Sequence, residues 1–297
     1  MSRRPGLYNA RSIARSVVPD SLSADTSAEM GDEAMPTVST NGVELYYESQ
    51  GDGPPIVFAH GVGGNHASWY QQVPFFARWY RVITFDHRGF GNSSDDPTGP
   101  GRAAFVDDLA GLLSALGVQQ TALVAQSMGG WTMLGYTLRH PERVRALVMA
   151  DTLGGITEPG PLADLQADLS RRTRDLPQLE RVLAPGFPSR HPAEALLYSQ
   201  IASFNRADRF NLRGDTGVSP RPAEVAGLKT PILFLVGAED VLHPVEEIRR
   251  VQEAIPGSSL TVVPDAGHSV YFESPHVFNH AVLSFLSAAG YPGSRAD

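Results

Sequence analysis

The most constraining stretch of this chain is a serine that stands between an apolar run and a helix-like segment. The run covers residues 121–125, the segment covers residues 128–139, and Ser127 lies between Ala125 and Gly129. A sharp strand-to-helix turn that lifts a serine hydroxyl off a sheet requires small neighbours, because its backbone conformation is sparsely populated. The usual pattern is Gly-x-Ser-x-Gly, and Ala125 departs from it by one methyl group. The stretch therefore predicts a nucleophile elbow.

Short apolar runs alternate with helix-like segments along most of the chain after residue 36. Before them, residues 37–48 form a predicted β-hairpin whose Asn41-Gly42 pair suits a two-residue turn. The alternation predicts an α/β fold, with a mostly parallel central sheet and helices on both of its faces. The predicted strands are 56–60, 81–85, 121–125, 144–150, 232–236 and 260–263, and the predicted helices are 66–79, 102–116, 128–139, 245–255 and 275–288.

Residues 153–222 break this alternation. They contain no strand-like run but several helix-like pieces, including 162–174 and 192–204. We interpret them as a helical cap inserted between two core strands. The α/β core would then consist of residues 36–152 and 223–290.

Composition excludes several classes of function. The net charge of −8 argues against a general nucleic-acid binder, and no apolar run approaches the roughly 20 residues that span a membrane. The absence of cysteine excludes disulfides, thiolate metal sites and a cysteine nucleophile. Residues 159–222 nevertheless carry nine arginines against seven acidic residues. We interpret this excess as a solvated face, with a preference for anionic substrates as the alternative.

The first 35 residues have a different composition from the rest. Four arginines precede the first acidic residue, as in a transit peptide or a disordered tail. An export signal that began at Arg3 and Arg4 would need an apolar core, which Arg11 and Arg15 interrupt. We predict that residues 1–35 form a disordered N-terminal extension of a cytoplasmic protein.

A serine hydroxyl needs a base to remove its proton and a third group to orient that base. Asp240 follows the predicted strand 232–236, and His268 follows the predicted strand 260–263. The carboxyl ends of parallel strands meet at one edge of a sheet, where ligands bind. We therefore expect Ser127, Asp240 and His268 to converge there.

With these residues the chain resembles the α/β-hydrolase family over about residues 36–290. The order Ser, Asp, His along the chain is the order of that family. The matching motifs are His60-Gly61-x-Gly63, Asp86-x-Arg88-Gly89-x-Gly91-x-Ser93, Ala125-x-Ser127-x-Gly129, Gly237-x-x-Asp240 and Gly267-His268.

The resemblance implies a role for each site residue. Ser127 would attack an acyl carbon, His268 would take its proton, and Asp240 would hold the imidazole in the correct tautomer. The backbone N–H groups of Val62 and Met128 would form the oxyanion hole.

Two other residues are alternatives to these assignments, and a third has a supporting role. Asp151, which follows the strand 144–150, is an alternative acid, and His243 beside the acid loop is an alternative base. His60 is expected to brace the oxyanion loop rather than to bind a metal. No metal or cofactor is expected.

Five residues are predicted to line a substrate pocket, although packing within the fold is an equal alternative for the apolar residues of the cap. They are Trp131, Phe187, Leu197, Phe204 and Val241.

The family that the chain resembles contains many activities, and fold does not choose among them. Relatives that displace groups at saturated carbon have aspartate where this chain has Ser127, so serine indicates acyl transfer. We predict hydrolysis of a small to medium carboxylic ester or lactone. The alternatives are carbon–carbon bond hydrolysis of a diketone, cofactor-free haloperoxidase or perhydrolase activity, and a non-catalytic receptor or scaffold. The oligomeric state stays open.

Overall fold

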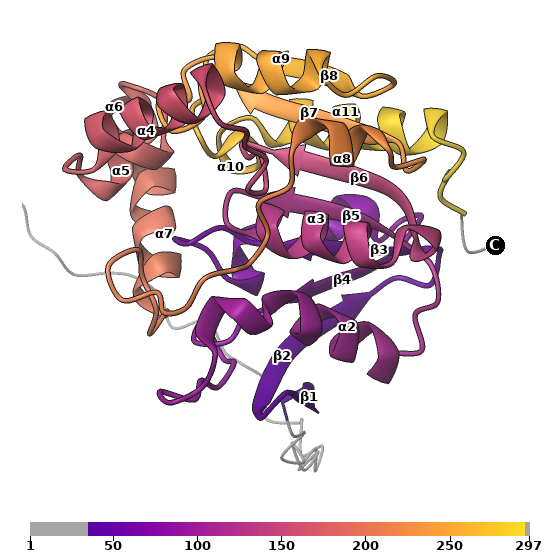
Figure 1. The fold of residues 1–297 in the computed structure, drawn as a ribbon. Helices are drawn as coiled ribbons and strands as arrows, with labels where there is room; N and C mark the ends of the chain where they lie inside the picture. Colours follow the sequence, from indigo (N-terminus) through magenta and orange to yellow (C-terminus); the bar gives the residue numbers. More distant parts are fainter. Residues whose placement is uncertain (1–34, 295–297) are drawn as a thin grey trace, which may run out of the picture. The chain divides into compact units, whose positions relative to one another are not determined.

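The computed structural model describes residues 35–294, and an eight-stranded sheet forms their centre (Figure 1). The strand order is β1-β2-β4-β3-β5-β6-β7-β8. The strands from β4 to β8 in this order run parallel, whereas β2 pairs antiparallel with both β1 and β4. The strands are β1 (Thr37–Thr40), β2 (Val43–Gln50), β3 (Pro55–Ala59), β4 (Arg81–Phe85), β5 (Thr121–Gln126), β6 (Val144–Ala150), β7 (Ile232–Gly237) and β8 (Ser259–Val263).

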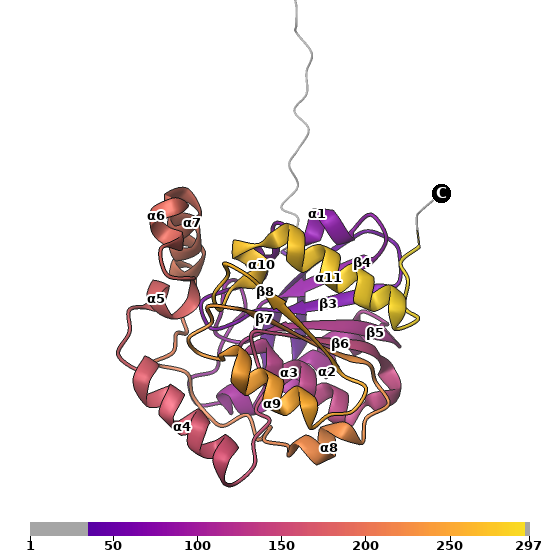
Figure 2. The same cartoon turned by 90° about the horizontal axis from the view of Figure 1, so that it is seen from above.

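Helices cover both faces of the sheet, as the alternation predicts (Figure 2). One face packs against α2 (Phe105–Ala115), α3 (Gly129–Arg139), α8 (Pro222–Ala226) and α9 (Val245–Glu253). The other packs against α1 (Val73–Phe76), α10 (Val270–Glu273) and α11 (Pro275–Ala288). Because both faces are covered, every residue of β5 and of β7 is buried. The predicted fold class is confirmed.

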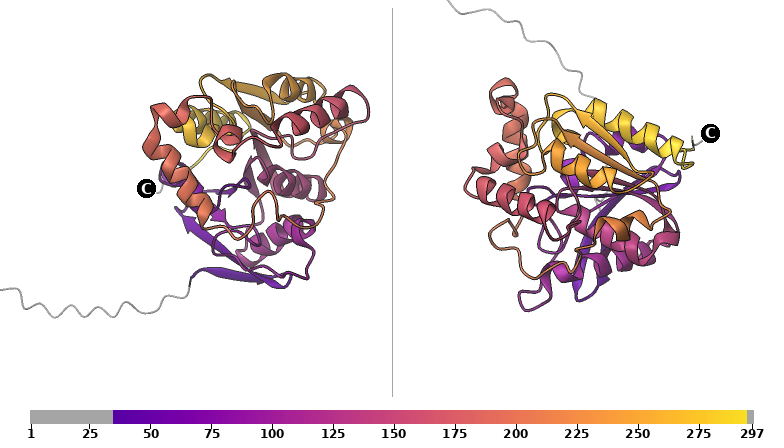
Figure 3. Two further views of the ribbon diagram at one scale, coloured as in Figure 1. Left: turned by 90° about the vertical axis from the view of Figure 1, so that its left-hand side faces the viewer. Right: turned by 45° about the horizontal axis from the view of Figure 1, so that its top comes forward.

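A helical insertion without strands separates β6 from β7. Its helices are α4 (Pro161–Thr173), α5 (Gln178–Val182), α6 (Phe187–Arg190) and α7 (Pro192–Ser203). Figure 2 and the right-hand view of Figure 3 show these helices together at one end of the sheet. The longer helices α4 and α7 agree with the predicted pieces. The shorter α5 and α6 span little more than one turn, too few residues for a periodic pattern to reveal.

Two predictions about the N-terminal half have different outcomes. The predicted helix 66–79 is two separate pieces, η1 (His66–Trp69) and α1. The predicted extension lies outside the described residues apart from Met35. Within residues 35–294, no helix is long and apolar enough to cross a membrane.

Candidate active site

The turn between β5 and α3 places Ser127 in a backbone conformation that is rare for a residue with a side chain. Its φ is +48°. The following turn passes so close to β3 that a Cβ atom at Gly129 would lie 2.4 Å from the carbonyl oxygen of Ala59. Ala125 is fully buried, and its methyl group belongs to the core on one face of the sheet. The departure from Gly-x-Ser-x-Gly is therefore accommodated by packing.

The structure brings Ser127, His268 and Asp240 into one hydrogen-bonded chain. His268 Nε2 lies 2.8 Å from Ser127 Oγ, and His268 Nδ1 lies 2.9 Å from Asp240 Oδ2. A carboxylate only accepts hydrogen bonds, so Nδ1 carries the proton and Nε2 accepts from the serine hydroxyl. This tautomer leaves a basic nitrogen facing the hydroxyl.

The Asp240 side chain is held in its charged form. Its Oδ1 accepts backbone hydrogen bonds from Leu242 at 2.8 Å and from His243 at 3.0 Å. Burial raises the pKa of Asp240, but the neighbouring His268, its hydrogen bond and His243 outweigh burial and hold that pKa below its usual value. A charged Asp240 favours a proton on Nδ1 of His268, the imidazole nitrogen that it contacts.

Asp151 lies at the end of the next strand, but it bonds backbone groups and not an imidazole. It accepts hydrogen bonds from Gly237 N at 3.1 Å and from Val270 N at 3.2 Å. Burial and the charge of Asp240 raise the pKa of Asp151 well above its usual value. The geometry thus assigns the imidazole contact to Asp240 and leaves Asp151 as a link between β7 and α10.

Two glycines allow the acid loop and the histidine loop to touch. A Cβ atom at Gly237 would lie 2.1 Å from the carbonyl oxygen of Gly267. A Cβ atom at Gly267 would lie 2.5 Å from the backbone nitrogen of Ala184, in the helical insertion. Both glycines of the two sequence motifs are therefore required by backbone contacts.

The two predicted oxyanion donors belong to residues at the cavity that Ser127 lines. Val62 and Met128 line the same cavity as Ser127 and His268. Within residues 35–294, neither backbone N–H of this pair donates to a protein acceptor. Gly61 lets the loop approach β5, because a Cβ atom there would lie 2.1 Å from Gln126 Oε1. Two free N–H groups beside a serine can stabilise a developing oxyanion.

A cavity of about 610 Å³ opens in front of Ser127, and the insertion supplies much of its wall. It is large enough for a small-molecule ligand. Within the described part of the chain, no three His, Asp or Glu side chains are arranged to hold a metal ion.

Comparison with known proteins decides the family. A family model of the α/β-hydrolase fold matches residues 54–191, and a model described as TAP-like protein matches residues 213–296. The chain is 31% identical over 261 residues to 3-oxoadipate enol-lactonase 2 of Acinetobacter baylyi, an alignment that covers 84% of this chain and 96% of that enzyme. The chain belongs to the α/β-hydrolase family.

Further relatives of this α/β-hydrolase are also enzymes. A 2-hydroxy-6-oxo-6-(2'-aminophenyl)hexa-2,4-dienoic acid hydrolase of Metapseudomonas resinovorans is 28% identical, with 84% of this chain and 90% of that enzyme covered. The structure of a thermophilic esterase from Thermogutta terrifontis matches with a TM-score of 0.70 and 26% identity, covering 86% of this chain and 98% of that one. The hydrolase is accordingly an enzyme and not a scaffold.

In this hydrolase, His60 braces the loop that carries Val62. Its Nδ1 donates to Gly61 O at 2.8 Å, and its Nε2 accepts from the backbone N–H of His87 at 3.0 Å. Burial lowers the pKa of His60 to about 4, although nearby Asp86 opposes this, so the ring is neutral at pH 7.

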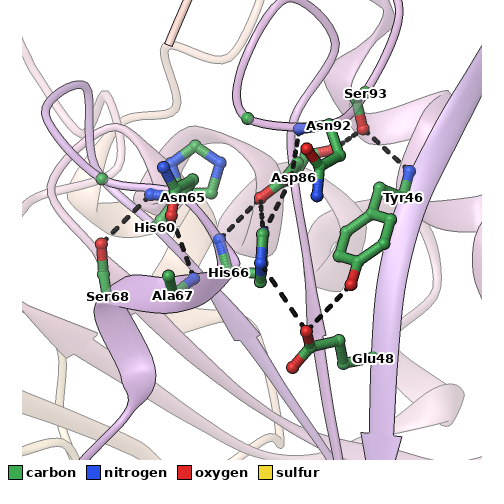
Figure 4. Close-up of polar contacts among 12 residues, drawn as sticks. Tyr46, Glu48, His60, Asn65, His66, Ala67, Ser68, Asp86, Asn92 and Ser93 are labelled. Atoms are coloured by element: carbon green, nitrogen blue, oxygen red, sulfur yellow. Dashed lines mark hydrogen bonds and ion pairs between the residues drawn. The ribbon is translucent and has the colours of Figure 1, made fainter. Parts of the chain in front are cut away.

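Asp86 organises the other side of the same loop (Figure 4). Its carboxylate accepts backbone hydrogen bonds from His66 at 2.6 Å and from Asn92 at 2.8 Å, and it contacts the His66 ring at 2.9 Å. Ser93 Oγ donates to the Asp86 carbonyl at 2.7 Å. The loop motif after β4 in the hydrolase thus supports the loop after β3.

His243 does not take the position of the base. Its ring lies 5.8 Å from that of His268, centroid to centroid, and its Nδ1 lies 2.9 Å from Glu247 Oε2. Burial lowers the pKa of His243, but Glu247 and Asp240 outweigh burial and raise it. His243 therefore pairs with Glu247 and does not contact Ser127.

Of the five predicted pocket residues, Trp131 lines the cavity of the hydrolase. The other four lie elsewhere. Phe187 is buried and stacks on His191, Leu197 is half-buried and packs against the hydrophobic core, and Phe204 is 71% exposed. Val241 is half-buried in the turn after Asp240 and does not line the cavity formed by residues 35–294.

The pocket residues predicted from the sequence did not include the polar side chains that line this cavity. Arg174, Arg181 and Arg209 of the insertion line it, together with Gln166 and Ser170 of α4. The excess of arginine in residues 159–222 was the available signal, but composition alone does not say which arginines face inward.

Proposed function

We propose that this enzyme hydrolyses a small to medium carboxylic ester or lactone through a covalent intermediate on Ser127. The observation that carries the proposal is the hydrogen-bonded chain from Ser127 through His268 to Asp240, with distances of 2.8 and 2.9 Å. An unassisted serine is a poor nucleophile, and this arrangement supplies both the base and its orienting group.

The proposed reaction has two halves. Ser127 Oγ attacks the carbonyl carbon while His268 Nε2 takes the hydroxyl proton, and the oxyanion accepts hydrogen bonds from Val62 and Met128 N–H. The C–O bond to the leaving group then breaks as His268 returns the proton to the leaving alkoxide. Water next attacks the acyl-enzyme with His268 again as base, which releases the acid and regenerates Ser127.

The relatives support acyl transfer as the chemical class. Their names describe a lactonase and an esterase, both of which cleave an acyl–oxygen bond. Carbon–carbon hydrolysis is the nearest alternative, since another relative is a dienoic acid hydrolase. The cavity is large enough for a small molecule, and arginines line part of its wall. Both features suit either class of reaction.

The test is turnover of 4-nitrophenyl acetate and butyrate by the wild type and by Ser127→Ala. We expect the variant to lose at least about 10³-fold in kcat, because removal of a triad member leaves only binding and oxyanion stabilisation. A fluorophosphonate probe should add its mass to the wild type and not to the variant. Equal rates for the two proteins, at equal thermal stability, would overturn the proposal.

A further inference from the structure

We propose that the substrate of this enzyme carries a carboxylate on a short arm beside the scissile bond, and that Arg181 and Arg209 of the insertion bind it. This inference rests on the proposed function and names the class of ester or lactone that the site accepts.

The position of the two arginines relates them to the reacting atoms. Both line the main cavity, and both also line a narrow extension of about 70 Å³ whose wall includes Ser127 and His268. A space of this size holds two or three water-sized groups, since one water occupies about 30 Å³ in the liquid. A group that fills the extension is therefore within a few bonds of the carbon that Ser127 attacks.

Neither guanidinium is neutralised by the protein. Within residues 35–294, no carboxylate lies within 4.0 Å of Arg181 or Arg209. Other arginines of the insertion differ in this respect: Arg171 pairs with Asp168 at 3.2 Å, and Arg213 pairs with Asp95 at 2.7 Å. No carboxylate of the described residues therefore competes with a ligand for these two guanidinium groups.

The hydrogen bonds of these arginines leave donors for a ligand. Arg181 Nη1 donates to Thr173 O at 2.5 Å, and Arg209 donates to Arg174 O at 2.7 Å and to Leu176 O at 3.3 Å. Each guanidinium carries five N–H donors, so several stay available on each. The carbonyl contacts fix the positions of both side chains, which reduces the entropy lost when an anion binds.

The charge balance of the site also favours an anion. Burial lowers the pKa of Arg181, and the positive charge of Arg209 lowers it further. One carboxylate, that of Glu247, lines the same cavity among the described residues. It is buried, and its Oε2 lies 2.9 Å from His243 Nδ1. A substrate carboxylate would relieve the repulsion between the two guanidinium groups, and arginine binds carboxylates in a bidentate manner.

The alternative role for these arginines is structural, because their carbonyl contacts join the end of α4 to the segments that follow. The experiment therefore compares two esters of equal chain length in one protein. 4-Nitrophenyl hydrogen glutarate carries a terminal carboxylate, and 4-nitrophenyl pentanoate does not. Spontaneous hydrolysis of each is subtracted.

We expect the wild type to favour the glutarate ester in kcat/KM. Arg181→Gln and Arg209→Gln should each lower the glutarate-to-pentanoate ratio by about 10-fold to 100-fold, mainly through KM, since a hydrogen bond to a charged group is worth that much. Arg181→Lys should restore part of the ratio. Arg171→Gln, which removes an exposed arginine paired with Asp168, should leave the ratio unchanged.

Binding without turnover separates this inference from the proposed function. Calorimetric titration of Ser127→Ala with glutarate should show binding that is lost in Ser127→Ala/Arg181→Gln and Ser127→Ala/Arg209→Gln. Thermal unfolding checks that each variant is folded. If pentanoate and glutarate esters are cleaved equally and the arginine variants keep that ratio, the carboxylate inference is wrong while the esterase proposal stands. If neither ester is cleaved but glutarate still binds through the arginines, the proposed reaction is wrong and the anion site stands.

Discussion

The carboxyl edge of the sheet and the helical insertion supply the two walls of one cavity, and they are built differently. On the sheet side, Ser127 and His268 lie in loops that follow strands, and glycines allow the close backbone contacts of these loops. On the insertion side, Arg181 and Arg209 are half-buried and are held by bonds to carbonyl groups alone. In the proposed reaction, the groups whose distances must stay fixed therefore belong to the sheet side. In the proposed substrate site, recognition tolerates small shifts and depends on side chains of the insertion that can be substituted one at a time.

The sharpest test of the sheet side separates its two buried carboxylates. Asp240→Asn should lower kcat for 4-nitrophenyl butyrate by about 10⁴-fold, because an amide no longer fixes the Nδ1–H tautomer of His268. Asp151→Asn should lower the free energy of unfolding through its two backbone contacts and reduce kcat far less. The opposite order of effects on kcat would transfer the role of the acid to Asp151.

A second test compares packing in the two regions. Phe234→Ala in β7 removes a fully buried ring and should cost about 3–5 kcal/mol in the free energy of unfolding. Phe204→Ala, at the end of α7, removes a ring that is 71% exposed and should change that quantity by no more than about 0.5 kcal/mol. Urea denaturation measures both. A large loss at Phe204 would show that the insertion depends on a contact absent from the described residues.

The third test concerns Glu273, which joins the two regions. Its carboxylate accepts hydrogen bonds from Gly267 N at 2.9 Å on the histidine loop and from Ala184 N at 2.7 Å in the insertion. Burial raises the pKa of Glu273 to about 7, despite these bonds. The folded state therefore holds a proton that the unfolded state has released, in the window between about pH 4.5 and pH 7.

Across this window the contribution of Glu273 to stability falls as pH rises, by at most about 3 kcal/mol. Glu273→Gln removes this titration, so the free energy of unfolding of the variant minus that of the wild type should increase from pH 5 to pH 8. Glu253→Gln, at an exposed position of α9, serves as the control without such a trend. A difference that stays constant with pH would show that Glu273 does not titrate in this range.

The two regions also differ in how far sequence alone could predict them. Ser127, Asp240 and His268 each follow a strand, and parallel strands bring such positions to one edge, so their convergence was predictable. Asp240 and Asp151 follow neighbouring strands, so position alone did not choose between them. The choice of Asp240 rested on the Gly237-x-x-Asp240 motif, and the contact of His268 Nδ1 agrees with it.

In the insertion, the periodicity of apolar residues identifies a helix, but it does not show what each face of that helix contacts. Phe204 and Phe187 were therefore candidates of equal standing, although one is exposed and the other buried. Arg181 could not be distinguished from the other arginines, since its inward position depends on where the short helix α5 lies. The break between η1 and α1 was hidden because the apolar residues on either side fit a continuous helix.

The contact of Gly267 with Ala184 limits how this enzyme can be re-engineered. The insertion is an obvious segment to exchange with that of another member of the family, because it runs from one strand to the next. Its backbone, however, fits against the histidine loop with no space for even one methyl group. A chimaera that brings a bulkier chain to this point would displace His268, so donor segments should be chosen by their backbone path near residues 183–184 before their side chains are considered.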